Sequence, residues 1–533
     1  MYQWVIAGGQ IVDGTGRPPY PANLAINQGK VARISESPLE GETTLSVKGK
    51  LVAPGFIDLH GHSEFTLLAD PRGASKLLQG VTTEIVGNCG GWVAPLTGLA
   101  EEKARKRAQT YGAEHHLNWD TVDQYLTLLQ ATQPAINVGV LVGHSNLRAV
   151  TIGSDDRPAN GRDLEQMGQC LKDMLAQGAW GMSAGLYYAP GSFATQEEMS
   201  YLLRELAKFG ALYTCHMRDE GENVKESVEE MVRLALTTGA KSQIAHIKAF
   251  GTRSWHKAPQ LIDVIEAGRH RGADLWADQY PYIASDTRIS GSMLSLARWA
   301  ESGGREKFLE RLANPTTRER ITAEVQEAIA LRGGPERILI SEYDPKPHWA
   351  GRYLADLAQE HHLCGAHMVL KMLEAGDGRT SCFSMHEDDL ERFMQAPWVA
   401  VASDGRALAV DGPLRTGHPH PRSFGTFPRV LGRYVRERGI LAWEEAIRKM
   451  TSLPADILGL HQRGRLQEGG WADVVVFDPR TVEDKSTFTA PFAYPIGIDH
   501  VWVNGQLAVE SGQITGQQRG MILRKTDEPL KSN

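Results

Sequence analysis

The sequence predicts an α/β protein in which a (β/α)8 TIM-like barrel is joined to a small β-sandwich domain and carries an inserted segment. Short apolar strands alternate with stretches of helical period from about residue 55 to residue 462, as in βα units around a parallel sheet. Short strands separated by turns dominate residues 1–54 and return only in residues 463–533. We therefore expect the two ends of the chain to build one β-sandwich beside the barrel.

The barrel region contains eight candidate strands, which is the number that the fold requires. We expect them to end near His60, Cys89, His144, Leu186, His216, Lys248, Tyr280 and Asp404. The helices between them include residues 195–209, 224–238 and 258–271. Residues 288–338 are rich in Arg and Glu with helical periodicity, and they are too long for a simple βα connection. We interpret them as an insertion near the mouth of the barrel.

The composition argues against several kinds of partner. The 533 residues include 57 Lys and Arg against 64 Asp and Glu, so the net charge of -7 offers no basic field for nucleic acid. An unbroken apolar run of about 18 residues, as a membrane span requires, is absent from the sequence. The N-terminus lacks the basic and apolar regions of a secretory signal, so we expect a cytoplasmic protein. None of these features predicts an oligomeric state.

Metal-compatible side chains follow several of the predicted strands. Catalytic groups of a barrel gather at the C-terminal ends of its strands, so these side chains should lie close together. His60 and His62 share one face by strand alternation, and His216 and His246 end two successive apolar strands. Cys89 follows another strand among glycines, where a thiolate could bind zinc. Each signal alone is weak, since a lone Cys is more often a small buried residue, but together they indicate a shared metal site.

Asp404 closes this series at the last predicted strand. It follows Val399-Ala400-Val401-Ala402-Ser403, where a carboxylate has no obvious structural purpose. We assign Asp404 to general acid/base work on water at the metal. Cys215 adjoins His216 in the same strand, so alternation turns it toward the helices and we assign it to packing.

These residues, in this order, resemble the amidohydrolase superfamily and, within it, the N-acyl-D-amino-acid deacylases, also called D-aminoacylases. The resemblance covers nearly the whole chain. Its motifs are Pro54-Gly55-Phe56-Ile57-Asp58-Leu59-His60-Gly61-His62, Gly87-Asn88-Cys89-Gly90, Gly143-His144-Ser145-Asn146-Leu147-Arg148, His216-Met217-Arg218-Asp219-Glu220, Tyr280-Pro281-Tyr282, Ser403-Asp404-Gly405 and His418-Pro419-His420-Pro421-Arg422. In that family a cysteine replaces the carbamylated lysine as the bridging group, and the fourth predicted strand here, residues 179–186, contains no Lys.

The resemblance implies two metal positions. One zinc would be held tightly, and its ligands would be Cys89, His216 and His246. A second, weaker site would be framed by His60, His62 and Asp404.

The resemblance also implies that Arg422 and Tyr280 hold a substrate carboxylate, with Lys248 near the substrate. One departure affects this contact. The family usually has a Gly-Ser pair after Tyr-Pro-Tyr, whereas Ala284-Ser285-Asp286-Thr287 occurs here, so the carboxylate-binding serine is either displaced to Ser285 or replaced. Asp286 would repel the carboxylate if it pointed inward.

Several of these residues also have structural interpretations. Arg422 could merely anchor its loop, although its planar guanidinium suits a carboxylate. Tyr188 could donate to a developing oxyanion or could be a packed aromatic side chain. Arg218 and Glu220 could form a structural ion pair behind the metal ligands.

We expect zinc-dependent hydrolysis of the amide bond of N-acyl-D-amino acids, which are small-molecule substrates, to a carboxylate and a free D-amino acid. The D configuration comes from the resemblance alone. A cyclic amidase or a dipeptidase on the same scaffold is the alternative within enzymes, and a carboxylate-binding Arg422 argues against it. A non-catalytic, hydantoinase-like scaffold is the alternative outside enzymes, but such a protein would be expected to have lost metal ligands.

Overall fold

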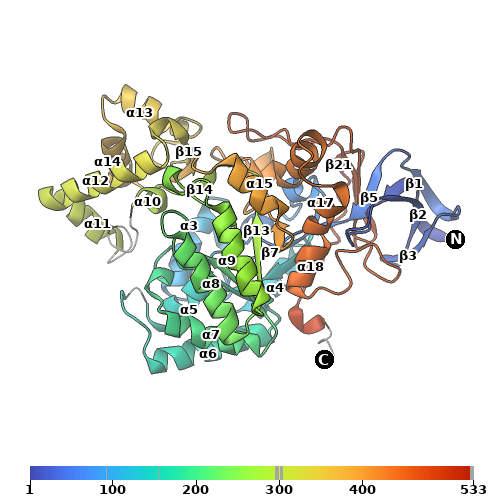
Figure 1. Ribbon diagram of the computed structural model, residues 1–533, viewed down its shortest axis with the longest axis horizontal. Helices are drawn as coiled ribbons and strands as arrows, with labels where there is room; N and C mark the ends of the chain where they lie inside the picture. The colour runs from blue at the N-terminus through green and yellow to red at the C-terminus, as the bar shows by residue number, and fades with distance from the viewer. Residues whose placement is uncertain (92, 154, 295–298, 300–303, 529–533) are drawn as a thin grey trace.

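Eight strand positions in the middle of the chain follow the predicted order. The computed structural model describes residues 1–91, 93–153, 155–294, 299 and 304–528 (Figure 1). One parallel sheet contains β6 (Phe56–Asp58), β7 (Val81–Val86) and β8 (Asn137–Val140). A second parallel sheet contains β9 (Val142–Gly143), β10 (Gly181–Gly185), β11 (Leu212–His216), β12 (Ser242–Ile244), β13 (Leu275–Gln279) and β17 (Val399–Val401). Strands β8 and β9 together occupy one of the eight positions.

The two parallel sheets approach each other at both edges. Only Leu141 separates β8 from β9 along the chain. At the opposite edge, Gly61 pairs with Gly405 in a parallel bridge. The amide of Asp404 also donates to the carbonyl oxygen of His60 at 2.8 Å. The segment that follows β6 therefore lies beside the segment that follows β17, and both carry predicted site residues.

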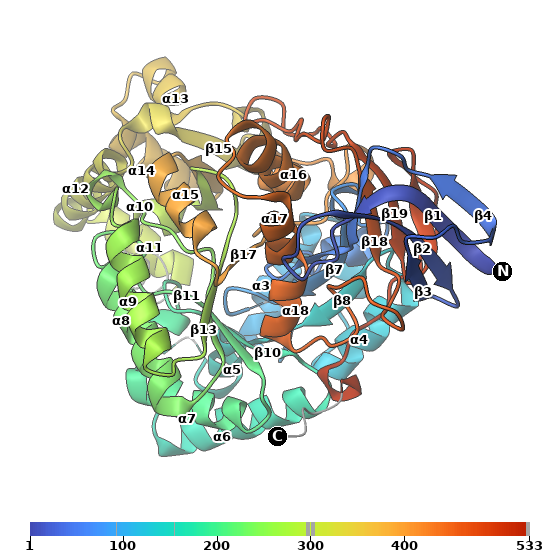
Figure 2. The same ribbon diagram turned by 45° about the vertical axis from the view of Figure 1, so that its right-hand side comes forward.

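Helices lie along the outer side of these strands, as the turned view in Figure 2 shows for α6 to α9. Their bounds are Gly161–Ala176 for α6, Gln196–Ala207 for α7, Val224–Thr238 for α8 and Ala258–His270 for α9. In α8 the residues Val228, Met231, Val232 and Ala235 recur at helical spacing and are buried. Gly239, with φ of 70°, ends this helix in the left-handed conformation that glycine adopts without strain.

Strands from both ends of the chain form one sheet of nine strands, which lies at the right of Figure 1. Its members are β1 (Tyr2–Ile11), β2 (Tyr20–Asn27), β3 (Lys30–Ser35), β4 (Gly41–Ser46), β5 (Leu51–Pro54), β18 (Val474–Phe477), β19 (Ile498–Val503), β20 (Gln506–Glu510) and β21 (Gln513–Ile514). The two ends join where β5 pairs with β18. Ile6, Leu24, Val476 and Trp502 are buried together against this sheet. Its division into the two layers of a sandwich stays a prediction.

The segment between β13 and β17 forms a unit with its own sheet and core, at the left of Figure 1. Its antiparallel sheet contains β14 (Ser285–Arg288), β15 (Ile338–Glu342) and β16 (Arg379–Cys382), and its helices are α10 (Ile289–Met293), α11 (Gly304–Ala313), α12 (Pro315–Leu331), α13 (Leu354–Glu360) and α14 (Gly365–Ala375). The predicted end of the insertion near residue 338 is wrong. The segment continues to Cys382, because β16 lies between β14 and β15 and completes the sheet.

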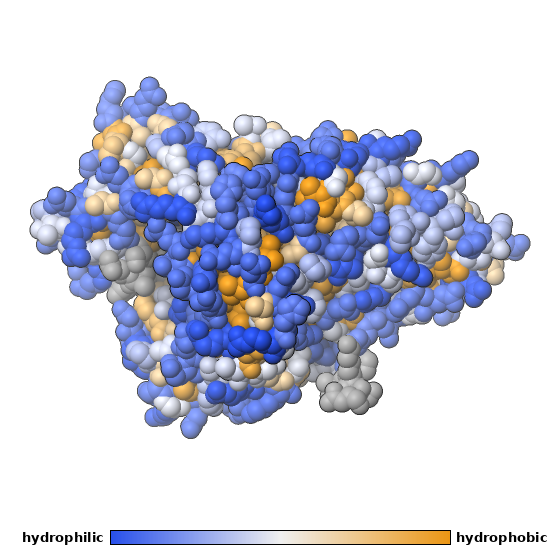
Figure 3. All heavy atoms as spheres, in the orientation of Figure 1, coloured by the Kyte–Doolittle hydropathy of each residue, from blue (hydrophilic) through white to orange (hydrophobic). Residues whose placement is uncertain are grey.

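The remaining helices connect or follow the strands of the two parallel sheets. They are α1 (Thr66–Ala69), α2 (Ala74–Leu77), α3 (Leu99–Gln109), α4 (Val122–Ala131), α5 (His144–Thr151), α15 (Glu387–Gln395), α16 (Arg422–Arg429), α17 (Trp443–Met450) and α18 (Ser452–Leu458). Among the helices of the described ranges, none has the length and the apolar composition needed to cross a bilayer. The face drawn in Figure 3 is mostly hydrophilic, with scattered apolar side chains.

Candidate active site

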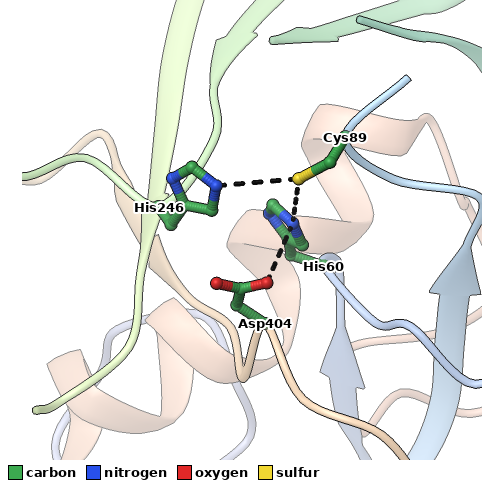
Figure 4. A group of neighbouring side chains, drawn as sticks. All are labelled: His60, Cys89, His246 and Asp404. Atoms are coloured by element: carbon green, nitrogen blue, oxygen red, sulfur yellow. Dashed lines mark hydrogen bonds and ion pairs between the residues drawn. The ribbon is translucent and has the colours of Figure 1, made fainter. Parts of the chain in front are cut away.

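Four side chains that follow four different strands point toward one another (Figure 4). They are His60, Cys89, His246 and Asp404. Cys89 Sγ lies 3.4 Å from His60 Nε2, 3.6 Å from His246 Nε2 and 3.9 Å from His216 Nδ1. Ligand atoms around a tetrahedral zinc are separated by about 3.3 to 3.8 Å when their bonds to the ion are about 2.0 to 2.3 Å long. The donor atoms and their spacing therefore fit zinc.

Asp404 connects this cluster to the guanidinium of Arg422 beside it. Its Oδ1 lies 3.1 Å from His62 Nε2 and 3.6 Å from His60 Nε2. Its Oδ2 lies 2.7 Å from Arg422 Nη1. With His216 in contact with Cys89, all six residues predicted as metal ligands lie in one continuous cluster.

Three residues of the cluster have strained backbones. The φ angles are 55° for Cys89, 36° for His246 and 48° for Asp404. Residues other than glycine rarely adopt this conformation, which costs of order 1–3 kcal/mol each and is concentrated at functional sites. The surrounding packing holds the chain in an unfavourable conformation at the three places where donor atoms converge.

Glu220 orients two of the histidines from behind. Its Oε1 lies 2.9 Å from His246 Nδ1 and 2.7 Å from Lys248 Nζ, and its Oε2 lies 3.6 Å from His216 Nε2. Burial would raise the pKa of Glu220, but the charges of Lys248, His216 and His246 lower it well below its usual range. Since Nδ1 of His246 faces this carboxylate, Nε2 faces Cys89, as a metal ligand requires.

The structural interpretation that pairs Arg218 with Glu220 is wrong. The Arg218 guanidinium pairs with Glu230 at 2.9 Å, because Glu230 lies on α8 beside it and Glu220 turns toward Lys248 instead.

Asp278 orients His60 as Glu220 orients His246, but Asp278 was not predicted as a site residue from the sequence. Its Oδ2 lies 3.1 Å from His60 Nδ1, and its Oδ1 accepts a hydrogen bond from the His246 amide at 2.9 Å. A signal for it exists: Asp278 precedes Tyr280 by two residues, so strand alternation turns both toward the same side.

The cluster favours a thiolate at Cys89. Burial would raise the pKa of this thiol, but the charge of His60 and hydrogen bonds with His216 and His246 lower it well below its ordinary value. Burial lowers the pKa of His62, but hydrogen bonds with Asp404 and Cys89 outweigh it and raise that pKa to about 10. The thiolate is the form of cysteine that binds metal ions.

The cluster opens into a cavity of about 570 Å³ between the loops that follow the parallel strands and the inserted segment. All five residues predicted to contact substrate line it: Tyr188, Lys248, Tyr280, Ser285 and Arg422. The Arg422 guanidinium lies 4.9 Å from the center of the Tyr280 ring. Within the described ranges, the buried Tyr280 hydroxyl has no hydrogen-bond partner, so it is free to donate into the cavity. The Tyr188 hydroxyl instead lies 3.0 Å from Thr287 Oγ1.

Asp286 could repel a substrate carboxylate, but hydrogen bonds from other residues of the protein compensate its negative charge. Its Oδ1 accepts a hydrogen bond from Arg379 Nε at 2.8 Å, and its Oδ2 accepts one from the Ser341 hydroxyl at 2.6 Å. Burial would raise the pKa of Asp286, but the charges of Arg379 and Arg422 lower it below its usual range. Arg379 is supplied by β16, 93 residues along the chain.

The loop that carries Arg422 is fixed by a neutral histidine. The His420 ring contacts the Ala284 carbonyl through Nε2 at 2.9 Å, and its Nδ1 accepts the Arg422 amide hydrogen at 3.0 Å. Burial, with the charge of Arg422, lowers the pKa of His420 to about 3. A neutral ring with its hydrogen on Nε2 satisfies both contacts and places Arg422 at the start of α16.

Comparison with known proteins agrees with this geometry. The amidohydrolase family model matches residues 44–274 and 365–509. N-acyl-D-glutamate deacylase from Alcaligenes xylosoxydans xylosoxydans is 35% identical over 524 residues, which are 98% of this chain and 96% of that protein. The chain belongs to the amidohydrolase family of N-acyl-D-amino-acid deacylases. The resemblance seen in the sequence is thus confirmed.

Two further members of this deacylase family are similar over almost their whole length. D-aminoacylase from Alcaligenes xylosoxydans xylosoxydans is 34% identical over 526 residues, 98% of each chain. A solved structure of N-acyl-D-glutamate deacylase from Bordetella bronchiseptica, complexed with zinc and a phosphonate that mimics the tetrahedral intermediate, is 33% identical. It covers 98% of this chain and 99% of its own with a TM-score of 0.80. The chain therefore has the amidohydrolase fold.

Proposed function

We propose that this protein hydrolyses the amide bond of N-acyl-D-amino acids to a carboxylate and a free D-amino acid. The observation that carries the proposal is the position of Asp404 between the Cys89 cluster and Arg422. A group that can move a proton thus lies between a metal-type cluster and a cation suited to a substrate carboxylate. The family membership and the names of the relatives support the same reaction.

We infer that the eight strand positions close into a (β/α)8 barrel. The parallel order of both sheets, the short β8–β9 junction and the bridge between Gly61 and Gly405 support this inference. In such a barrel the strand ends share one face, which accounts for the convergence of the cluster.

The donor set supports zinc as the metal. We propose that Cys89, His216 and His246 hold one ion tightly, and that His60, His62 and Asp404 frame a second, weaker site that shares Cys89. When bound, zinc supplies Lewis acidity that polarises a carbonyl oxygen and lowers the pKa of a water molecule.

Asp404 is proposed as the acid/base group. Burial would raise the pKa of Asp404, but the charges of Arg422 and His246 and a hydrogen bond with His62 lower it far below its usual value. The carboxylate is therefore ionised at neutral pH and can accept a proton from the attacking water. It then returns this proton to the departing amine nitrogen.

Arg422 and Tyr280 are proposed to hold the substrate carboxylate. The Arg422 guanidinium uses Nη1 for Asp404, and a guanidinium has five N–H donors in all, so others remain for a ligand. The Tyr280 hydroxyl supplies one more donor. Lys248 stays close to Glu220 at 2.7 Å, and Ser285 and Tyr188 line the same cavity.

A hydrolysis screen of paired D and L N-acetyl amino acids tests the proposal, with zinc measured in the same sample. Asp404→Asn, purified in parallel, controls for contaminating hydrolases. We expect zinc-containing protein that hydrolyses D substrates and leaves L substrates nearly untouched. Hydrolysis of cyclic amides in preference to N-acyl amino acids, or equal activity in the Asp404→Asn sample, would contradict it.

A further inference from the structure

A second arginine lies beside the proposed carboxylate site. Arg406 follows Asp404 by two residues and lines the same cavity as Arg422. Its backbone is fixed on two sides, since its amide donates to Ser423 Oγ at 3.1 Å and its carbonyl accepts from Ser75 Oγ at 3.3 Å. The backbone position of Arg406 is therefore set by the loop that also carries Asp404.

Three guanidinium groups surround the single carboxylate of Asp286. The charges of Arg379, Arg422 and Arg406 all act on it. Arg379 already donates two hydrogen bonds to Oδ1, at 2.8 and 2.5 Å, and two serine hydroxyls of the inserted sheet donate to Oδ2. Arg422 is paired with Asp404 at 2.7 Å. Asp286 therefore has no free oxygen for Arg406.

Other carboxylates do not neutralise Arg406 either. Among the residues that the structure describes, no Asp or Glu oxygen lies within ion-pair distance of its guanidinium. Glu342 faces Arg107 at 3.7 Å. A guanidinium stays protonated at neutral pH, so Arg406 is a cation.

We propose that Arg406 binds a second carboxylate on the substrate, so that the protein prefers N-acyl-D-amino acids with two anionic groups to those with one. This inference rests on the proposed function, because Arg422 and Tyr280 must already hold the first carboxylate. The second carboxylate could belong to the side chain of an acidic D-amino acid or to a dicarboxylic acyl group. A guanidinium without a carboxylate partner suits either, since it can form two parallel hydrogen bonds with a carboxylate.

Another cavity-lining arginine is less suited to this role. Arg332 donates through Nη1 to the Ala328 carbonyl of its own helix at 2.7 Å and lies 4.6 Å from the Phe250 ring center. It therefore closes the end of α12 and is held against an aromatic ring. It nevertheless provides a useful alternative in the experiment, because its Nε is buried and unpartnered.

The test compares substrate pairs that differ only in the second charge. N-acetyl-D-glutamate is paired with N-acetyl-D-glutamine, and N-succinyl-D-leucine with its succinamide counterpart. We expect the wild type to favour the charged member of one pair by about 10-fold to 100-fold in kcat/KM, as for a hydrogen bond to a charged group. The pair that shows the preference identifies the source of the carboxylate.

Variants then assign the preference to a residue. Arg406→Met should reduce it to about 3-fold or less while leaving kcat/KM for the neutral member within about 3-fold, since only a hydrogen bond to the second carboxylate is lost. Arg406→Lys keeps the charge without the fork and should restore part of it. Arg253→Met is the matched control, because Arg253 lines the cavity but pairs with Glu222 at 3.0 Å and Glu327 at 2.6 Å.

Two results would overturn the proposal about Arg406. One is a wild type that hydrolyses neutral N-acyl-D-amino acids with no preference in either pair. The other is a preference that survives in Arg406→Met, or that disappears in Arg332→Met instead. A wild type that hydrolyses no N-acyl-D-amino acid at all would reject the proposed function itself, and this outcome is distinct from both.

Discussion

Two regions of the cavity are built differently. One is the metal-type cluster around Cys89, and the other, here called the carboxylate side, is formed by Arg422, Asp286 and Arg379. Members of the cluster lie at or just after the ends of strands in the two parallel sheets, as His60 follows β6 and Cys89 follows β7. The carboxylate side joins Arg422, at the start of α16, to Asp286 and Arg379 from the inserted sheet. The backbone of the cluster is strained at three residues, and its side chains carry charges of both signs. The carboxylate side instead contains more guanidinium groups than carboxylates.

This difference suggests a division of labour. Damage to the cluster should reduce turnover of every substrate equally, because the proposed reaction takes place there. Damage to the carboxylate side should change which substrates are accepted and leave the metal in place.

Cys89→Ala should remove zinc and reduce activity by about 10⁴-fold or more, since Lewis acidity contributes several kcal/mol and each 1.36 kcal/mol is a factor of ten. Metal analysis and a hydrolysis assay on the same sample check this. Cys215→Ala is the matched control, because Cys215 is a buried cysteine outside the group of candidate ligands and burial raises its pKa to about 12. Full zinc occupancy in Cys89→Ala would mean that this thiol only packs.

Asp404→Asn should keep its zinc and lose activity by about 10²-fold to 10⁴-fold, the range for a missing general base. The amide still fills the space between His62 and Arg422 but cannot accept the proton. Rates for two substrates of different side chain should fall by the same factor. Turnover close to that of the wild type would exclude the acid/base role.

Arg422→Ala should lower kcat/KM for N-acyl-D-amino acids by about 10-fold to 100-fold, as a hydrogen bond to a charged group contributes about 1.5 to 3 kcal/mol. Zinc content should not change, and Arg422→Lys should recover part of the loss. An amidated substrate without a free carboxylate sharpens the test, because only the wild type should discriminate against it. If both proteins discriminate equally, Lys248 becomes the better candidate.

Cys89→Gly should be more stable than Cys89→Ala by about 1 kcal/mol, since glycine adopts a positive φ without strain and alanine does not. Both variants lack the thiol, so the comparison isolates the backbone at φ of 55°. Chemical denaturation of the two metal-free proteins measures the difference. Equal stability would mean that the backbone at Cys89 relaxes at little cost.

The cluster was largely predictable because strand order alone brings its members together. Parallel strands end at one edge, so His60, Cys89, His246 and Asp404 could be grouped from their positions after apolar runs. Helix α8 was predictable because residues 224–238 have a helical period, and Gly239 ends the helix. These patterns do not reveal the left-handed backbone at Cys89, His246 and Asp404.

The carboxylate side was less predictable because its contacts depend on pairing between distant segments. Asp286 and Arg379 meet only because β14 pairs with β16 across the inserted unit. The partner of Glu220 likewise depends on how β11 and β12 pair, which turns Lys248 rather than Arg218 toward it. The end of the insertion was missed for the same reason, since a strand near residue 380 gives no sign of its partners until the sheet is assembled.

The Cys89 cluster is proposed to be a catalytic zinc centre that acts on N-acyl-D-amino acids. Its most direct test is to titrate metal-free protein with zinc while following hydrolysis of an N-acetyl-D-amino acid and the X-ray absorption of the zinc. Activity should rise until about one equivalent is bound, with a sulfur ligand at about 2.3 Å. Full activity in the metal-free protein, or bound zinc without a sulfur ligand, would contradict the claim.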